Sequence, residues 1–147
     1  MLAVAIAIPA EGAFQYAYRD PGGLPTICMG HTQGVRMGDF RTMAECKALL
    51  TQDMLHAIST VDKCVPGLPV PVLAAFSDAV FNLGPKIVCN KAKSTAARLL
   101  AKGDYTAACL QLPRWNTAPV LGVNVILPGL TIRRNMEKDL CLTHSTA

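Results

Sequence analysis

The chain has 147 residues, of which 51% are hydrophobic and 16% are charged, and its net charge is +4. This length predicts one domain, spanning residues 1–147, with a full hydrophobic core, and the composition excludes a disordered chain. The basic residues are scattered and carry no interleaved aromatic side chains, which argues against a nucleic-acid binder and fits weak attraction to an anionic polymer such as a cell wall.

The first ten residues, MLAVAIAIPA, form an uninterrupted apolar run with no basic residue before it. The run is too short to span a bilayer, which takes about 20 residues, and it lacks the charged start of a signal peptide. Its alternation of Ala with Val or Ile is compatible with a strand or with a buried helix end. Two interpretations stay open: the first turns of a core helix, or the end of a longer export segment.

Closely spaced glycines and prolines over residues 20–36 predict a small, tight antiparallel hairpin or sheet. The pattern after this stretch becomes helical. Thr42 and Glu45 form a T-x-x-E capping box, which marks the start of a helix. Apolar residues then recur at helical spacing, namely Met43, Cys46, Leu49, Leu50, Met54 and Ile58.

Prolines and a glycine at residues 65–71 break the chain before a second predicted helix. The apolar face of this helix consists of Leu73, Phe76, Val80 and Leu83. Gly84 is expected to end the helix, since glycine adopts the left-handed conformation of a C′ residue. Ser94 and Asp104 are the predicted N-caps of two further short helices, the first of which ends before Gly103.

Residues 112–130 are predicted to form a long irregular connection. Residues 131–140 predict a closing amphipathic helix with Ile132, Met136 and Leu140 directed inward. A β part near the N-terminus followed mostly by helices indicates an α+β fold.

Six cysteines are spread along the chain, at positions 28, 46, 64, 89, 109 and 141. None of them forms a CxxC pair, and the three histidines make no metal-ligand spacing with them, so no metal site is predicted. An even count without a metal pattern favours an oxidising compartment and three disulfides, with buried free thiols as the alternative. Six cysteines allow fifteen connectivities.

The residues from Glu11 to Thr26 could perform glycoside hydrolysis, which needs one protonated and one ionised carboxyl group. Glu11 follows the apolar run, where desolvation would keep its carboxyl protonated as a general acid. Asp20 lies between Arg19 and a Pro-Gly-Gly turn, a wetter and more cationic setting that favours the carboxylate. Thr26 adds a hydroxyl that can hold the attacking water. From spacing alone, both acids are also explained as solvated groups that start or cap a turn.

The spacing Glu, eight residues, Asp, five residues, Thr resembles the phage-type lysozyme family, the endolysins of glycoside hydrolase family 24. The similarity covers residues from about 11 to 141 in the family's order. The motifs that carry it are EG at 11–12, Y-x-D-x-x-G-x-x-T-I at 18–27, GHT at 30–32, FNLG at 81–84, LPRWN at 112–116 and LPGLTIRR at 127–134.

The resemblance implies a muramidase without a cofactor that cleaves the β-1,4 bond between N-acetylmuramic acid and N-acetylglucosamine in peptidoglycan during host lysis. Glu11 would be the general acid, Asp20 the carboxylate that supports the water or the oxocarbenium side, and Thr26 the water-positioning hydroxyl of an inverting reaction. The implied fold is α+β and lysozyme-like, mostly helical, with a small N-terminal antiparallel sheet. A cleft between the two lobes would carry the catalytic acids on its rim.

Four further residues are candidates for substrate contact, namely His31, Asn82, Trp115 and Arg133. Each also has a structural explanation. His31 would be a hydrogen-bonding residue, Asn82 would help to form the cleft, Trp115 would belong to the core, and Arg133 would pair with acids near the C-terminus. The segment from Pro119 to Ile126 is longer than the family's usual short Gly-Gly connection, which puts substrate contacts near Trp115 in doubt.

Cys28 stands where many family members carry glycine, which resembles the cysteine-rich, exported branch. In part of this branch an N-terminal signal-anchor tethers the enzyme to the inner membrane and later releases it, and MLAVAIAIPA looks like the end of one. We therefore expect a monomer in the periplasm. The expected disulfides join neighbours in sequence order, Cys28–Cys46, Cys64–Cys89 and Cys109–Cys141.

Two alternative functions remain. A lytic transglycosylase-like enzyme needs a lone glutamate and releases anhydro sugars, so the presence of Asp20 and Thr26 at the family's spacing argues against it. A non-catalytic peptidoglycan-binding or membrane-active protein would lyse cells through basic amphipathic helices and would release no new sugar ends.

Overall fold

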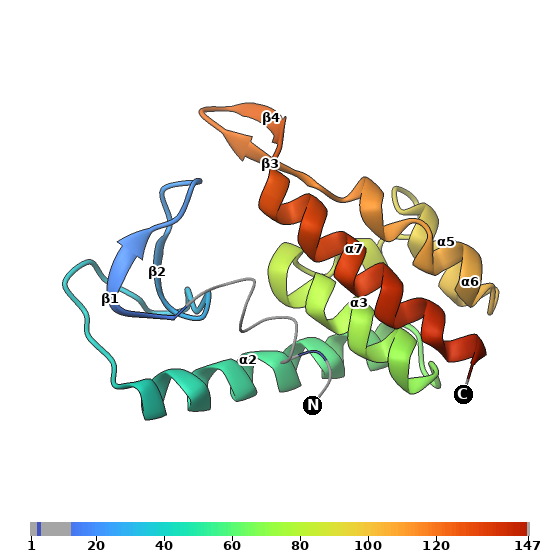
Figure 1. The fold of residues 1–147 in the computed structure, drawn as a ribbon, viewed down its shortest axis with the longest axis horizontal. Coiled ribbons are helices and arrows are strands. Elements are labelled where there is room, and N and C mark those ends of the chain that lie inside the picture. The colour runs from blue at the N-terminus through green and yellow to red at the C-terminus, as the bar shows by residue number, and fades with distance from the viewer. Residues whose placement is uncertain (1–2, 4–12, 147) are drawn as a thin grey trace.

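The computed structural model describes residue 3 and residues 13–146 (Figure 1). A small hairpin lies at one end of the molecule, the long helix α2 runs from beneath it, and the remaining helices gather at the other end. The elements are β1 (Phe14–Arg19), β2 (Pro25–Cys28), α2 (Met43–Cys64), α3 (Val70–Leu83), α4 (Lys86–Cys89), α5 (Thr95–Ala101), α6 (Tyr105–Cys109), η1 (Leu112–Arg114), β3 (Thr117–Val120), β4 (Val123–Ile126), α7 (Pro128–Leu142) and η2 (Thr143–Ser145).

The N-terminal apolar run and Glu11 lie outside the described residues, except for Ala3, which is buried. The two interpretations of this run therefore stay predictions. Of the helices in the described part of the chain, none combines the length and the apolar character that crossing a bilayer requires.

The predicted small antiparallel hairpin is present but begins earlier than expected. β1 and β2 pair antiparallel, with Tyr18 opposite Thr26, and the pairing is irregular between Phe14 and Tyr18. The Pro-Gly-Gly residues make the turn rather than a strand, and the first strand precedes them because alternating aromatic residues favour extended pairing there.

The predicted local helix signals are confirmed. The Thr42 hydroxyl accepts a hydrogen bond from Glu45 N at 3.2 Å, and the Glu45 carboxylate accepts one from Thr42 N at 3.0 Å, which completes the capping box of α2. Ser94 and Asp104 cap α5 and α6 as expected. Gly84 follows α3 with a φ of 91°, a left-handed conformation that favours glycine. These signals could be predicted because each depends on residues three or four positions apart.

The prediction of an irregular connection over residues 112–130 is wrong. This segment contains η1 and a second antiparallel hairpin, in which β3 pairs with β4 through a two-residue turn at Leu121 and Gly122. Both turn residues have positive φ, 51° and 80°, as a type I′ hairpin turn requires. The hairpin stands out from the helical part near the start of α7 (Figure 1).

The predicted inward face of the last helix is wrong for two of its three residues. Ile132 and Met136 are 63% and 39% exposed, whereas Leu140 is half-buried and packs against the core as expected. The buried face of α7 instead carries Arg133, Arg134, Glu137 and Cys141. This face packs on α3, where Asp78 supplies a buried partner for the charges.

Four buried residues, Asp78, Arg133, Arg134 and Glu137, form a charge cluster between α3 and α7. The guanidinium of Arg133 donates to both carboxylate oxygens of Asp78, through Nε at 2.9 Å and Nη2 at 2.8 Å. Nη2 of Arg134 donates to Oε2 of Glu137 at 2.7 Å. Burial raises the pKa of Glu137 to about 10, and its hydrogen bond with Asp78 contributes in the same direction. Burial therefore favours the protonated form of this carboxyl, while the attraction of Arg134 acts in the opposite direction.

The raised pKa of Glu137 predicts a pH dependence of stability. The pKa of Glu137 is higher in the folded protein than its value of about 4.3 in the unfolded chain. The contribution of Glu137 to stability is therefore complete below the unfolded pKa and declines as the pH rises towards the folded pKa. We expect the urea concentration at the unfolding midpoint to decrease as the pH is raised from about 5 to about 8. Glu137→Gln should reduce this decrease, because glutamine does not ionise.

The matched control is Glu45→Gln, which lies in the exposed capping box. The backbone hydrogen bond from Thr42 lowers the pKa of Glu45, so its contribution is lost only as the pH falls through the acidic range. Glu45→Gln should therefore leave the fall between about pH 5 and about pH 8 unchanged. Equal slopes for wild type and Glu137→Gln over this range would contradict a protonated Glu137.

All three expected disulfides are present. Cys28–Cys46 joins β2 to α2, Cys64–Cys89 joins the end of α2 to α4, and Cys109–Cys141 joins α6 to α7. The described residues contain no free cysteine, so the alternative of buried thiols does not hold. The first bond lies two residues beyond Thr26 and fixes the strand that carries it to the long helix.

Candidate active site

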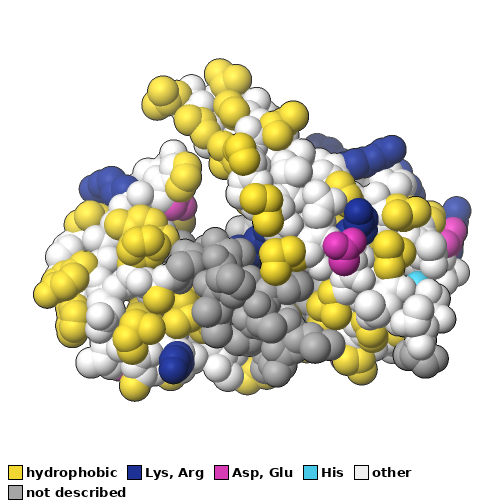
Figure 2. Space-filling view, in the orientation of Figure 1, with side chains coloured by type: hydrophobic (Ala, Val, Ile, Leu, Met, Phe, Trp, Pro, Cys, Tyr) yellow, Lys and Arg dark blue, Asp and Glu magenta, His cyan; other side chains and the backbone are white. Residues whose placement is uncertain are grey.

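A cavity of about 460 Å³, here called the groove, lies between the β1–β2 hairpin and the helical part. Its walls come from three places far apart in the sequence: the first hairpin, the end of α3, and the base of the second hairpin. Figure 2 shows a hollow between the first hairpin and the overhanging β3–β4 hairpin. The lining includes Tyr18, Asp20, Leu24, Thr26, Phe81, Asn82, Leu83, Ala118, Pro119, Leu127 and Leu130.

Asp20 is half-buried at the turn of the first hairpin. Its Oδ1 accepts a hydrogen bond from the backbone N–H of Leu24 at 2.8 Å. This hydrogen bond fixes the orientation of the carboxyl group at the turn. Arg19 is the cationic neighbour that the sequence predicts for Asp20. Its Nη1 donates a hydrogen bond to the carbonyl of Gly23 at 3.1 Å. Arg19 therefore stabilises the turn that holds Asp20 in place.

Thr26 lies on β2 and is buried, with 3% of its surface exposed, yet it lines the groove. Its hydroxyl donates to the carbonyl of Leu24 at 2.9 Å. Because the hydroxyl proton has this partner, what Thr26 offers to a molecule in the groove is an acceptor lone pair. An acceptor at this position can take a hydrogen bond from a water molecule and orient it.

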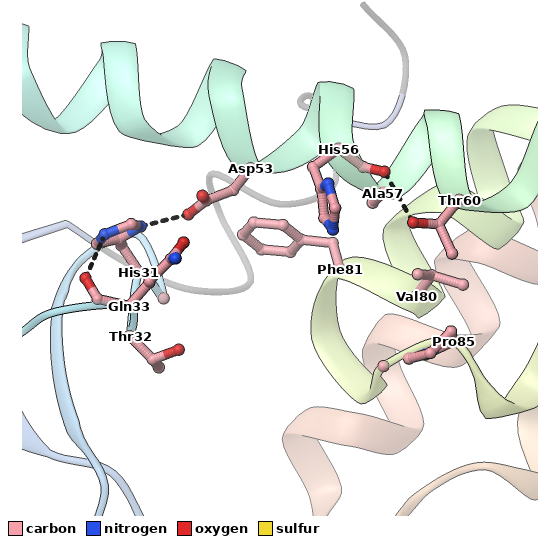
Figure 3. A pocket seen from close by; sticks show the side chains of 12 residues that line it. His31, Thr32, Gln33, Asp53, His56, Ala57, Thr60, Val80, Phe81 and Pro85 are labelled. Carbon is pink, nitrogen blue, oxygen red and sulfur yellow. Dashed lines mark hydrogen bonds and ion pairs between the residues drawn. The ribbon is translucent and has the colours of Figure 1, made fainter.

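His31 lies beside the groove in a second cavity of about 280 Å³, which shares Gly30, Thr32 and Phe81 with the groove. Figure 3 shows its imidazole between two partners. Nδ1 lies 2.6 Å from Oδ2 of Asp53 on α2, and Nε2 donates to the carbonyl of Gln33 at 3.0 Å. Both ring nitrogens have partners, which matches the structural explanation: His31 ties the first hairpin to α2.

The other predicted substrate-contact residues lie at different depths. Asn82 lines the groove. Arg133 is buried against Asp78, and its Cζ lies 5.7 Å from the ring centroid of Phe81, so it supports the groove wall from behind. Trp115 follows η1 and packs against the core, outside the described lining of the groove. A direct contact between Trp115 and substrate stays a prediction.

Phe81, which the sequence did not single out, lines both cavities and joins them. It lies in the quoted FNLG motif, where only Asn82 was selected. An aromatic residue in the last turn of a buried helix, next to a glycine stop, was the available signal. The wall from the second hairpin was also missed, because that segment was predicted to be irregular.

The sequence profile of the phage lysozyme family matches residues 9–137. The SAR-endolysin of Pseudomonas phage phiKMV is 37% identical over 148 residues, which cover 99% of this chain and 90% of that protein. The crystal structure of the active form of P1 phage endolysin Lyz has a TM-score of 0.83 at 27% identity, covering 97% of this chain and 84% of that one. The muramidase domain of SpmX from Asticaccaulis excentricus has a TM-score of 0.82 at 30% identity, and the match covers 96% of this chain and 95% of that domain.

These matches confirm the expected lysozyme-like α+β fold and the resemblance carried by the motifs. The chain belongs to the phage lysozyme family, as an enzyme of the lysozyme type that acts in phage lysis.

Proposed function

We propose that this chain is an endolysin that hydrolyses the β-1,4 bond between N-acetylmuramic acid and N-acetylglucosamine in peptidoglycan. The observation that carries the proposal is that Asp20 and Thr26 line one groove. A backbone N–H holds the Asp20 carboxyl group in place, and the Thr26 hydroxyl, whose proton is already donated, offers an acceptor lone pair. The groove takes its lining from the first hairpin, the end of α3 and the second hairpin, so that a bound glycan would contact all three. Similarity to a muramidase domain over nearly the whole chain supports the same chemistry.

In the proposed reaction, the carboxyl group of Glu11 donates its proton to the glycosidic oxygen as the bond to the sugar carbon breaks. The resulting oxocarbenium-like sugar is stabilised by the carboxylate of Asp20. A water that donates a hydrogen bond to Thr26 attacks from the opposite face, and Asp20 accepts the proton that this water loses. One water is consumed for each bond broken, and the anomeric configuration is inverted.

The protein is of an exported type, since its disulfides need an oxidising compartment and its relative in phage phiKMV is a SAR-endolysin. We further propose that it acts as a monomeric, single catalytic domain in the periplasm. Its N-terminal apolar run would be the end of a transient inner-membrane tether, and its partner would be the glycan strand.

Variants of Thr26 test the proposal through the release of reducing ends from purified cell wall. Thr26→Val removes the acceptor and keeps the side-chain shape, so we expect a loss of about 10²-fold, the cost of a misplaced reactant. Thr26→Ser retains the hydroxyl and should recover most of the rate. Thermal unfolding of both variants controls for the lost hydrogen bond to Leu24. Equal rates for the two variants would exclude a water-positioning role for this hydroxyl.

A further inference from the structure

The β3–β4 hairpin carries apolar side chains that no described element covers. Leu121, Val123 and Ile126 are 99%, 62% and 64% exposed. No charged residue occurs between Arg114 and Arg133. An isolated two-stranded hairpin is marginally stable in water, and exposed aliphatic side chains add nothing to its stability. By the strand register, Val123 and the 39% exposed Val125 share one face of the hairpin with Ala118, whereas Ile126 lies on the other face. Exposed apolar side chains gathered on one face in this way mark a binding surface.

The turn of the hairpin gives an independent reason to expect a partner. Leu121 has a φ of 51°, a conformation that a branched side chain adopts at a cost. A type I′ turn favours Asn-Gly, and this chain has Leu-Gly. Leucine at this position is thus unfavourable both for the backbone and for solvation in the free protein. A bound partner that buries the side chain would offset both costs.

The hairpin is continuous with the groove. Ala118 and Pro119, near its base, line the same cavity as Asp20 and Thr26. Across the groove, Leu24 lies at the turn of the first hairpin and is 51% exposed. Figure 2 shows the apolar β3–β4 hairpin overhanging the hollow. A polymer that lies in the groove and extends past Ala118 and Pro119 would meet the rest of the hairpin.

We infer that the β3–β4 hairpin is a second wall of the substrate groove, with Leu121 and Val123 packing on the methyl-bearing face of an N-acetylated glycan strand. This inference rests on the proposed function. The strand carries N-acetyl and lactyl methyl groups and no charge on its sugar rings, which matches an apolar, uncharged hairpin. A lipid surface and a second copy of the chain are the competing occupants, and neither explains why the hairpin is continuous with the groove.

The test is the double variant Leu121→Asn with Val123→Thr. Asn-Gly suits the type I′ turn and threonine suits a strand, so the melting temperature should be unchanged or higher while the apolar surface is lost. The wall concentration that gives half the maximal rate should rise about tenfold, as partial burial of two aliphatic side chains predicts, while kcat changes less than about twofold. Leu110→Asn, at the 53% exposed C-cap of α6, is the matched control and should behave as wild type.

Three results would overturn the inference. The first is an unchanged half-saturating wall concentration in the double variant. The second is loss of cosedimentation with phosphatidylglycerol vesicles with unchanged kinetics on wall, which would make lipid the partner. The third is a dimeric wild type that becomes monomeric in the variant. If wild type releases no reducing ends, the proposed function fails, and pelleting of both proteins with purified wall then decides on the hairpin separately.

Discussion

Glu11→Gln is expected to lose at least about 10³-fold of the rate on purified cell wall, because general acid–base groups contribute about 10²–10⁴-fold. Glutamine keeps the shape of the side chain and cannot donate the proton that the leaving sugar needs. Glu45→Gln is the matched control, since glutamine also completes a capping box and Glu45 lies far along the chain on α2. Near-wild-type turnover by Glu11→Gln would remove the basis of the whole site assignment.

Asp20→Asn should be as severe, since the amide can neither stabilise the oxocarbenium side nor accept the proton of the attacking water. Its matched control is Asp39→Asn. The carboxylate of Asp39 also accepts a backbone N–H bond, from Arg36 at 2.8 Å, but it lies outside the described lining of the groove. A loss of rate in both variants, rather than in Asp20→Asn alone, would indicate a folding defect instead of a catalytic one.

The Cys109–Cys141 disulfide is expected to have a large effect on stability. Replacing Cys109 and Cys141 by alanine should lower the free energy of unfolding by about 3–4 kcal/mol, because the bond closes a long loop in the unfolded chain. The two cysteines are 32 residues apart and join α6 to α7, the helix that supplies most of the charge cluster. Urea unfolding of the double variant and of wild type, each with and without reductant, measures the cost.

The pair Cys28 and Cys46, only 18 residues apart, is the comparison, and its removal should cost somewhat less, about 3 kcal/mol. Reductant should destabilise wild type by more than either double variant, since wild type has three bonds to lose. Six thiols that react only after unfolding, with no reductant added, would show that the bonds do not form and would remove the argument for export.

The last helix shows where sequence-based prediction fails. Apolar periodicity placed Ile132 and Met136 inward, but α7 buries Arg133 and Glu137 instead. The reason is Asp78, 55 residues away on α3, which pairs with Arg133 and shares a hydrogen bond with Glu137. A partner this distant leaves no trace in the local pattern of α7, whereas capping boxes and glycine stops involve near neighbours and were predicted correctly.

The groove also has one wall that the sequence predicts and one that it does not. Asp20 and Thr26 could be predicted together because one hairpin holds both, six residues apart. The opposite wall includes Phe81 on α3 and Ala118 on β3, which come together because α3 packs against α7, the helix that follows the second hairpin. The second hairpin was missed for a local reason, because leucine replaces the asparagine that usually marks a type I′ turn.

Digestion of purified cell wall in oxygen-18 water, followed by mass spectrometry of the released fragments, tests the central claim most directly. Hydrolysis predicts one oxygen-18 atom at each new reducing end of N-acetylmuramic acid, because the oxygen comes from the water that Thr26 orients. The Asp20→Asn protein should release almost none of these ends in the same time. Unlabelled anhydromuramic ends would show transglycosylation, and a wall that binds the protein but stays intact would show a non-catalytic role; either result would contradict the account.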